Sequence, residues 1–272
     1  MFPRRALKKI CREKACLKCN YRTLSLSFYT PFSDIVKCCF EPTHVIQLED
    51  GLGSYVTPDL ENRFRSGIFS FFNKFFFGNK LSYSAETLYL SSPEFSGPQA
   101  TEIRRLESFA STTDRTELMK RVYGFNDNPI YREKKAVYIT QPLEERHPTG
   151  MPESELLALL SEADPVIRVH PRQSANEFPG TVDTAANMWE LECAENISDS
   201  HVLIGAFSTA QFTPKMMFDR EPTLIFTYPL LGCDFDNADA MIERLRSTYR
   251  DRDKVRVIKT ADELKEVIAA IK

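Results

Sequence analysis

Three short motifs bring together residue types that can act on a phosphorylated sugar. They occur in the order Glu49-Asp50-Gly51, His170-Pro171-Arg172 and Ser208-Thr209. A carboxylate can accept a proton, an imidazole can donate one, and neighbouring hydroxyls can bind a phosphate. This combination is suited to displacing a nucleotide from an activated sugar.

Each motif also has a simpler structural explanation. Asp50 fits a turn, and His170 fits a strand end at which a backbone carbonyl satisfies the ring. Ser208 or Thr209 fits a helix N-cap, where free backbone N–H groups and the helix dipole also favour a phosphate. The functional interpretation therefore depends on the order of the motifs and on their position beside predicted strand ends.

The second half of the chain, from Lys135 onward, alternates short apolar segments with helical patterns. Strands are predicted at 136–140, 166–169, 201–205, 223–227 and 254–258. Helices are predicted at 153–162, 187–195, 209–218, 237–249 and 261–271. This alternation predicts an α/β fold with parallel βαβ units and a Rossmann-like sheet. Ligands of such sheets lie at the carboxyl ends of the strands, where His170 and Ser208 fall.

The first 134 residues are less regular. Strands are expected at 45–48 and 87–90, and a polar helix over 99–122. Residues 61–81 carry seven phenylalanines, which suit either a membrane-contacting surface or a buried core or dimer helix. The buried alternative is favoured, because large exposed apolar patches are rare in monomers. Peripheral membrane association and a homodimer both stay open.

The cysteines and paired aspartates offer weak metal-binding patterns. Cys16 and Cys19 have the spacing of a zinc pair, but the adjacent Cys38 and Cys39 make a poor second pair. Reduced thiols are therefore favoured. Two Asp-x-Asp pairs, at 234–236 and 251–253, fit a helix cap and a turn better than a cation site. We expect no metal and no cofactor.

Composition and charge exclude several classes of function. The chain has 272 residues and a formal net charge of −3, which argues against a general nucleic-acid binder, because binding phosphates needs a basic face. No apolar run is long enough to span a bilayer, and none follows the basic start as in a secretory signal. We expect a cytoplasmic protein, with a peripheral position on the inner membrane as the alternative.

The three motifs, in this order, resemble the bacterial sialyltransferases of the two-domain GT-B type. The closest likeness is to the lipooligosaccharide sialyltransferases (glycosyltransferase family 52) and the related capsule polysialyltransferases. The segment Leu48–Tyr55, which reads LEDGLGSY, and the segment Tyr138–Leu143, which reads YITQPL, are similar to that group. The likeness covers roughly residues 45–272.

This resemblance implies two Rossmann-like domains, of which the N-terminal one is incomplete, because only 49 residues precede Asp50. It divides the chain into a basic, Cys-rich leader (1–40), a partial acceptor-side domain (41–134) and a donor-binding domain (135–272). The implied reaction is a metal-independent, inverting transfer of sialic acid from CMP-sialic acid to a glycan acceptor, in lipooligosaccharide or capsule.

The resemblance also assigns roles to individual residues. Asp50 would be the general base on the acceptor hydroxyl, and His170 would protonate or stabilise the departing CMP phosphate. The implied donor-binding residues are Arg168 and Pro171 beside the cytosine, Glu190 at the ribose, Ser208 and Thr209 at the phosphate, and also Gly51 and Gln141. Two alternatives stay open: a GT-B-like transferase that uses a CDP-linked donor, and a non-catalytic fragment that binds nucleotide.

Overall fold

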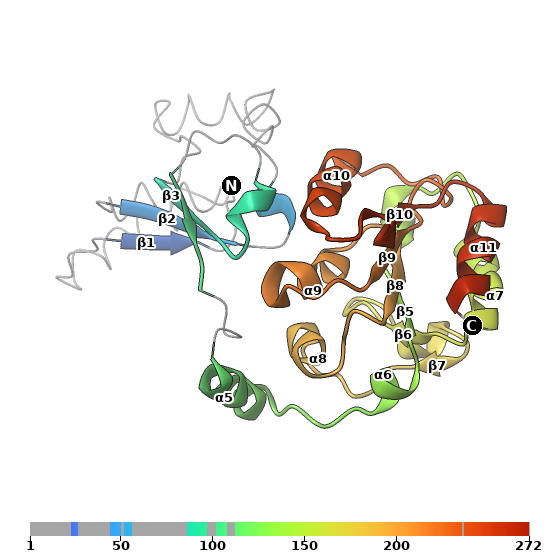
Figure 1. Cartoon of the computed structure of the whole chain (residues 1–272), viewed down its shortest axis with the longest axis horizontal. Helices are drawn as coiled ribbons and strands as arrows, with labels where there is room; N and C mark the ends of the chain where they lie inside the picture. The colour runs from blue at the N-terminus through green and yellow to red at the C-terminus, as the bar shows by residue number, and fades with distance from the viewer. Residues whose placement is uncertain are drawn as a thin grey trace, which may run out of the picture. The chain divides into compact units, whose positions relative to one another are not determined.

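The protein is represented by a computed structural model of the chain (Figure 1), which describes residues 23–26, 44–49, 52–55, 86–96, 102–107, 112–235 and 237–271. The chain divides into two compact units, Met1–Glu107 and Ser108–Lys272. In the described residues of each unit, all strand pairs are parallel.

The described part of the first unit contains a four-stranded sheet. Its strands, in spatial order, are β1 (Thr23–Leu26), β2 (His44–Leu48), β3 (Thr87–Leu90) and β4 (Glu102–Arg105). Its buried apolar side chains are Val45, Tyr55, Leu88, Leu90 and Phe95. The strands predicted at 45–48 and 87–90 are therefore present as β2 and β3.

The polar helix predicted over 99–122 is wrong in its first part. Residues 102–105 form β4, which pairs with β3 along its whole length. The helix α5 (Thr113–Tyr123) begins only after Thr112, whose hydroxyl caps its first turn. Pairing with a neighbouring strand thus overrides the helical preference of a charged segment.

The second unit contains a six-stranded sheet in the order β10-β9-β8-β5-β6-β7. The strands are β5 (Ala136–Ile139), β6 (Val166–Arg168), β7 (Thr181–Val182), β8 (Val202–Gly205), β9 (Thr223–Phe226) and β10 (Val255–Val257). The helices that follow α5 are α6 (Ile130–Glu133), α7 (Glu153–Leu160), α8 (Trp189–Glu195), α9 (Thr209–Phe218), α10 (Ala238–Thr248) and α11 (Ala261–Ile271). Figure 1 shows α8 and α9 on one face of this sheet and α7 and α11 on the other.

The strand order identifies the architecture of the second unit. The chain begins at β5, adds β6 and β7 on one side, and then adds β8, β9 and β10 on the other. This is the 3-2-1-4-5-6 order of a doubly wound Rossmann sheet. The predicted α/β class and Rossmann-like sheet are therefore confirmed for this unit.

Burial on both faces explains why the central strands are almost entirely apolar. All four residues of β5 are buried, and so are the last three of β8 and of β9. The helix α11 contributes Leu264, Val267 and Ile268, whose spacing places them on one helical face. Every helix in the described residues is too short or too polar to traverse a bilayer.

The boundary between the compact units falls after Glu107, whereas the sequence pattern placed it after residue 134. The reason is that α5 and α6 pack with the second unit. Lys120 of α5 forms an ion pair with Glu195 of α8 at 2.8 Å, and Tyr131 of α6 is fully buried.

Candidate functional site

The site is defined by the point at which the direction of strand addition reverses. That point lies between β5 and β8, which are hydrogen-bonded neighbours. Ligands of doubly wound sheets bind outside the carboxyl ends of the strands at this position. The residues that follow these two strands include Thr140 and Gln141 after β5, and Phe207 and Ser208 after β8.

The side chain of Gln141 fastens these two strand ends together. Its Nε2 donates a hydrogen bond to the Phe207 carbonyl at 2.7 Å, and its Oε1 accepts one from the Phe207 N–H at 2.8 Å. Both ends of the amide are thus used to shape the turn before α9. Gln141 was predicted to bind the donor, and a direct contact with a ligand stays a prediction.

The turn after β8 is a fully formed helix cap. Ser208 accepts a hydrogen bond from the Ala210 N–H at 3.3 Å, and its own N–H donates to Oε1 of Gln211 at 3.1 Å. The Gln211 side chain is completely buried and donates in turn to the Ile225 carbonyl at 3.0 Å. A Cβ at Gly205 would lie 3.1 Å from the Gln211 Oε1, which explains why β8 ends in glycine.

This cap fixes the position of the α9 N-terminus. Thr209, the first residue of α9, is exposed, and Ser208 is half-buried. The first-turn N–H groups and the helix dipole give this end a partial positive charge, which favours an anion such as a phosphate. The hydroxyl of Ser208 accepts a hydrogen bond from the first turn, and Thr209 is the exposed residue at this end of the helix.

His170 lies two residues after β6 and is tied to the end of β5. Its N–H donates to Oγ1 of Thr140 at 2.9 Å, and Oγ1 of Thr140 donates to Gln173 at 2.7 Å. The ring Nδ1 accepts a hydrogen bond from the Arg172 N–H at 3.1 Å. The proton of the neutral ring must therefore be on Nε2, which has no hydrogen-bond partner among the described residues.

The charge state of His170 follows from its surroundings. Partial burial lowers the pKa of the imidazole, the charge of Arg172 lowers it further, and Glu145 opposes both. Arg172 itself forms an ion pair with Glu145 at 2.6 Å. At neutral pH His170 is a neutral ring with an Nε2–H available to a ligand. Pro171, which follows it, is exposed.

Arg168 is held by protein groups. Its guanidinium forms an ion pair with Asp183 at 2.5 Å and donates to the Asn187 carbonyl. Burial opposes the ionisation of Asp183, but hydrogen bonds from Tyr131, the Ala185 N–H and Arg168 outweigh it and lower the pKa of Asp183. The predicted contact of Arg168 with a cytosine stays a prediction, while its role as an anchor of the segment before α8 is clear.

The start of α8 is joined to the start of α9. The Trp189 indole N–H donates to the Ala210 carbonyl at 2.8 Å. Glu190, the next residue, is half-exposed and has no hydrogen bond or ion pair with any described residue. By contrast, the fully buried carboxylate of Glu192 accepts hydrogen bonds from three asparagine amides, those of Asn128, Asn187 and Asn196. Glu190 is thus the carboxylate that a ligand hydroxyl could reach.

The first motif is only partly described. Asp50 and Gly51 lie outside the described residues, as do the Cys16 and Cys19 pair, the Phe-rich stretch 61–81 and Asp236. Glu49 directly follows β2 and accepts a hydrogen bond from the Ser91 N–H at 2.7 Å. This bond joins the carboxyl ends of β2 and β3 within the first unit.

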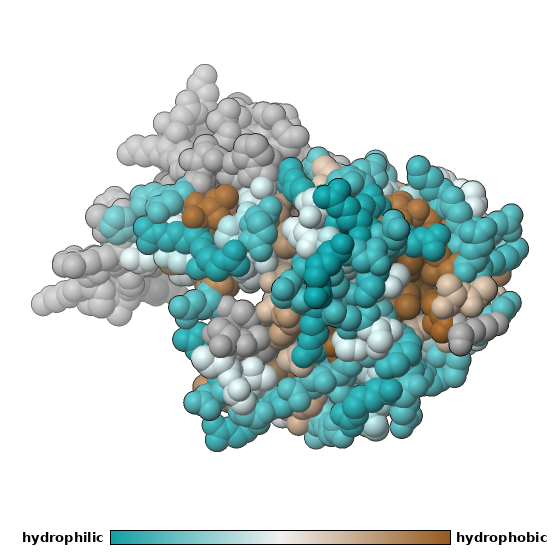
Figure 2. Space-filling view, in the orientation of Figure 1, coloured by the Kyte–Doolittle hydropathy of each residue, from teal (hydrophilic) through white to brown (hydrophobic). Residues whose placement is uncertain are grey.

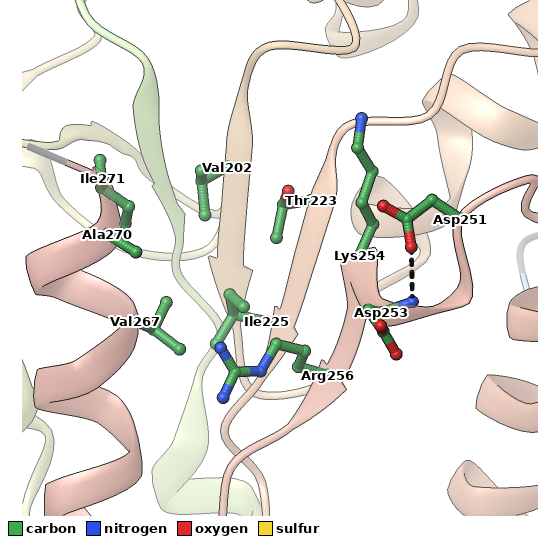
Figure 3. Close-up of a pocket in the computed structure, with 10 residues that line it drawn as sticks. All are labelled: Val202, Thr223, Ile225, Asp251, Asp253, Lys254, Arg256, Val267, Ala270 and Ile271. Carbon is green, nitrogen blue, oxygen red and sulfur yellow. Dashed lines mark hydrogen bonds between the residues drawn. The ribbon is translucent and has the colours of Figure 1, made fainter.

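A surface groove lies at the opposite, amino edge of the second sheet (Figure 3). Figure 2 shows apolar surface gathered beside α11, whose residues Val267, Ala270 and Ile271 line this groove. Asp251 and Asp253 form a capped turn there, since Oδ1 of Asp251 accepts a hydrogen bond from the Asp253 N–H at 3.0 Å. In the described residues no group of His, Cys, Asp and Glu has the geometry of a metal site. The groove contains none of the predicted site residues.

Sequence reasoning missed two residues that build the carboxyl edge. Thr140 and Gln211 both form hydrogen bonds that position the site. The available signal was their placement directly after a strand or at a helix start. The carboxyl edge therefore combines a capped helix N-terminus, an Nε2–H donor at His170 and a carboxylate at Glu190, which together can hold an anion and sugar hydroxyls. No protein-family model matches the chain, and no curated protein matches its sequence.

Proposed function

We propose that the chain is a sialyltransferase that transfers sialic acid from CMP-sialic acid to a surface glycan. The observation that carries the proposal is the joining of three strand ends beside the start of α9. Thr140 binds the His170 backbone, and Gln141 binds the Phe207 backbone on both sides. The His-Pro and Ser-Thr motifs are therefore held at one edge of one sheet, as a nucleotide-phosphate site requires.

The donor phosphate binds at the N-terminus of α9. The first-turn N–H groups and Thr209 neutralise its single negative charge, so no metal is needed. The Nε2–H of His170 donates to a phosphate oxygen of the leaving group. Because charge builds on that oxygen as the glycosidic bond breaks, this hydrogen bond is strongest in the transition state. Glu190 accepts hydrogen bonds from the ribose hydroxyls.

The reaction is a single inverting displacement. The acceptor hydroxyl oxygen forms a bond to the anomeric carbon, and the bond from that carbon to the CMP phosphate oxygen breaks. The electron pair of the broken bond leaves with CMP, and the acceptor proton passes to Asp50. The role of Asp50 follows from the resemblance of its motif to the sialyltransferase families.

The proposal extends to a GT-B-like protein in which the first unit is the acceptor-side domain. The parallel sheet of that unit supports this assignment. So does Glu49, whose hydrogen bond to Ser91 holds the chain directly before Asp50 at the carboxyl ends of β2 and β3.

Thermal shift with CMP, CDP and UMP tests the proposal. We expect CMP to raise the melting temperature more than UMP, and the variant Ser208→Ala/Thr209→Ala to lose most of that shift. Thr260→Ala is the matched control, because it removes the N-cap of α11, the helix that follows the outermost strand β10. It should lower the melting temperature of the free protein while retaining the shift with CMP. Equal shifts with CMP and UMP, or none, would contradict the proposal.

A further inference from the structure

Three aromatic rings extend from the start of α9 toward solvent. The Phe207 ring lies 5.4 Å from the Phe235 ring and 6.2 Å from the Tyr228 ring, measured between centroids. Phe207 and Tyr228 are almost fully buried, whereas Phe235 is half-buried. Phe207 directly precedes Ser208, so Phe235 forms the accessible end of a cluster that begins at the predicted phosphate site.

Arg146 lies on this accessible ring. Its guanidinium carbon is 4.8 Å from the Phe235 centroid, within the range of a cation–π contact. The side chain is exposed and forms no ion pair with any described residue. The positive charge of Arg146 acts on Cys233. Burial raises the pKa of the Cys233 thiol, and Arg146 opposes that rise.

The other two arginines of this edge are already neutralised. Arg168 is paired with Asp183 at 2.5 Å, and Arg172 with Glu145 at 2.6 Å. Of the arginines that follow β5 and β6 up to Arg172, Arg146 is thus the one whose charge has no carboxylate partner among the described residues. An aromatic ring orients a guanidinium without neutralising it, which leaves the in-plane N–H donors for a ligand.

The two loops that carry Arg146 and Phe235 are fastened to each other. The Gly150 N–H donates to the Leu231 carbonyl at 3.0 Å, and the Met151 N–H to the Leu230 carbonyl at 2.9 Å. The backbones approach so closely that a Cβ at Gly150 would lie 2.4 Å from the Leu230 oxygen. Gly232, at φ +64°, faces it, and a Cβ there would lie 2.3 Å from the Gly150 nitrogen. The Arg146–Phe235 pair is therefore built on a preformed support.

We propose that Arg146 binds a second anionic group of the ligand, next to the phosphate held at the start of α9. The identity of the ligand as a cytidine nucleotide rests on the proposed function. The second anion is either the carboxylate of the transferred sugar or a second phosphate, and both suit bidentate binding by a guanidinium. Arg146 would then distinguish doubly charged donors from nucleotides that carry a neutral sugar.

Calorimetric titration of Arg146→Gln with CMP, CMP-sialic acid and CDP tests this inference. Loss of a charge-assisted hydrogen bond should weaken one of the two larger ligands by about tenfold or more, and CMP by less than about twofold. A selective loss for CMP-sialic acid identifies the carboxylate, and a selective loss for CDP identifies a second phosphate. Arg252→Gln, an exposed arginine at the amino edge, is the matched control and should change none of the affinities.

The outcomes separate this inference from the proposed function. If Arg146→Gln weakens all three ligands equally, or none, the inference is overturned while CMP binding still stands. If the wild-type protein binds no cytidine ligand, the proposed function fails, and pyrophosphate titration then decides the inference alone. Arg146-dependent binding of pyrophosphate would retain it, and its absence would overturn it. Phe235→Leu, which keeps the arginine but removes its support, should reproduce part of the loss.

Discussion

Two histidines at opposite edges of the second sheet differ in the surroundings of Nε2. His201 directly precedes β8 at the amino edge, and His170 follows β6 at the carboxyl edge. In both, Nδ1 accepts a backbone N–H, from Ser198 at 3.0 Å and from Arg172 at 3.1 Å. Nε2 of His201 donates to the Tyr131 carbonyl at 2.7 Å, whereas that of His170 has no partner in the described residues. Both nitrogens of the His201 ring are therefore used within the protein, whereas the His170 ring retains an Nε2–H that a ligand can accept.

Charged side chains at the two edges follow the same division. At the amino edge the buried Glu221 pairs with Lys215 at 2.7 Å and with Arg250 at 3.1 Å. At the carboxyl edge Glu190 and Arg146 have no ion pair among the described residues. The buried carboxylate of Glu221 is thus neutralised within the protein at the amino edge, where it contributes stability. The carboxyl edge retains polar groups that a ligand can satisfy, as the rule for doubly wound sheets leads one to expect.

The largest effect is expected for His170→Ala, which removes the donor at the carboxyl edge. Losing one donor to a developing charge typically costs on the order of 100- to 1,000-fold in rate. The measurement is the release of CMP from CMP-sialic acid by the purified protein, with circular dichroism to verify folding. The melting temperature should change little. Near-normal CMP release by a folded variant would show that His170 has only a structural role at the end of its strand.

Glu221→Gln, at the amino edge, should lower the free energy of unfolding and leave the affinity for CMP unchanged. Breaking a buried ion pair typically costs 3–5 kcal/mol, and we expect about 3 kcal/mol because Lys215 retains Asp219. Urea unfolding measures this loss, and the affinity for CMP below the transition should be unchanged. Asp262→Asn, which breaks an exposed pair with Lys265, is the matched control and should cost less than about 1 kcal/mol. A weaker CMP affinity in Glu221→Gln would contradict the assignment of stability to the amino edge and of ligand binding to the carboxyl edge.

The smallest effect is an acid dependence of stability to which His201 contributes, with His170 acting in the same direction. Burial lowers the pKa of His201 below its ordinary value of 6.5, and the unfolded chain keeps the ordinary value. The unfolded state therefore binds a proton first as the pH falls, so the free energy of unfolding should decline below about pH 6.5. His201→Gln should flatten that decline, as measured by urea unfolding between pH 7.5 and pH 5. An unchanged slope would show that other groups cause it.

The sequence was sufficient for the strands that are apolar and buried. The runs at β5, β8 and β9 have no other good explanation, and their observed bounds match the predicted ranges within one residue at each end. β7 has only two residues, and β4 reads EIRR, so neither carries a pattern of its own. Both exist because a neighbouring strand supplies the pairing, which a local pattern cannot show.

The same limit applies to the site. His170 and Ser208 could be placed because each lies within three residues of the end of a strand that the sequence predicts. Whether a polar side chain faces a ligand or the protein depends on partners far along the chain. Gln141 binds Phe207, which is 66 residues away, and Arg168 binds Asp183 across a loop. Apart from its position after β5, nothing in the sequence indicated that Arg146 could bind a ligand.

Hydrogen–deuterium exchange with and without saturating CMP tests whether the carboxyl edge of the second sheet binds the nucleotide. We expect slower exchange at the start of α9, over 207–211, and after β6, over 170–173, because a bound phosphate would order these backbone N–H groups. The groove residues 251–256 at the amino edge should exchange at the same rate in both states. Protection confined to the amino edge, or none over 207–211 with CMP bound, would contradict the assignment of the carboxyl edge as the nucleotide site.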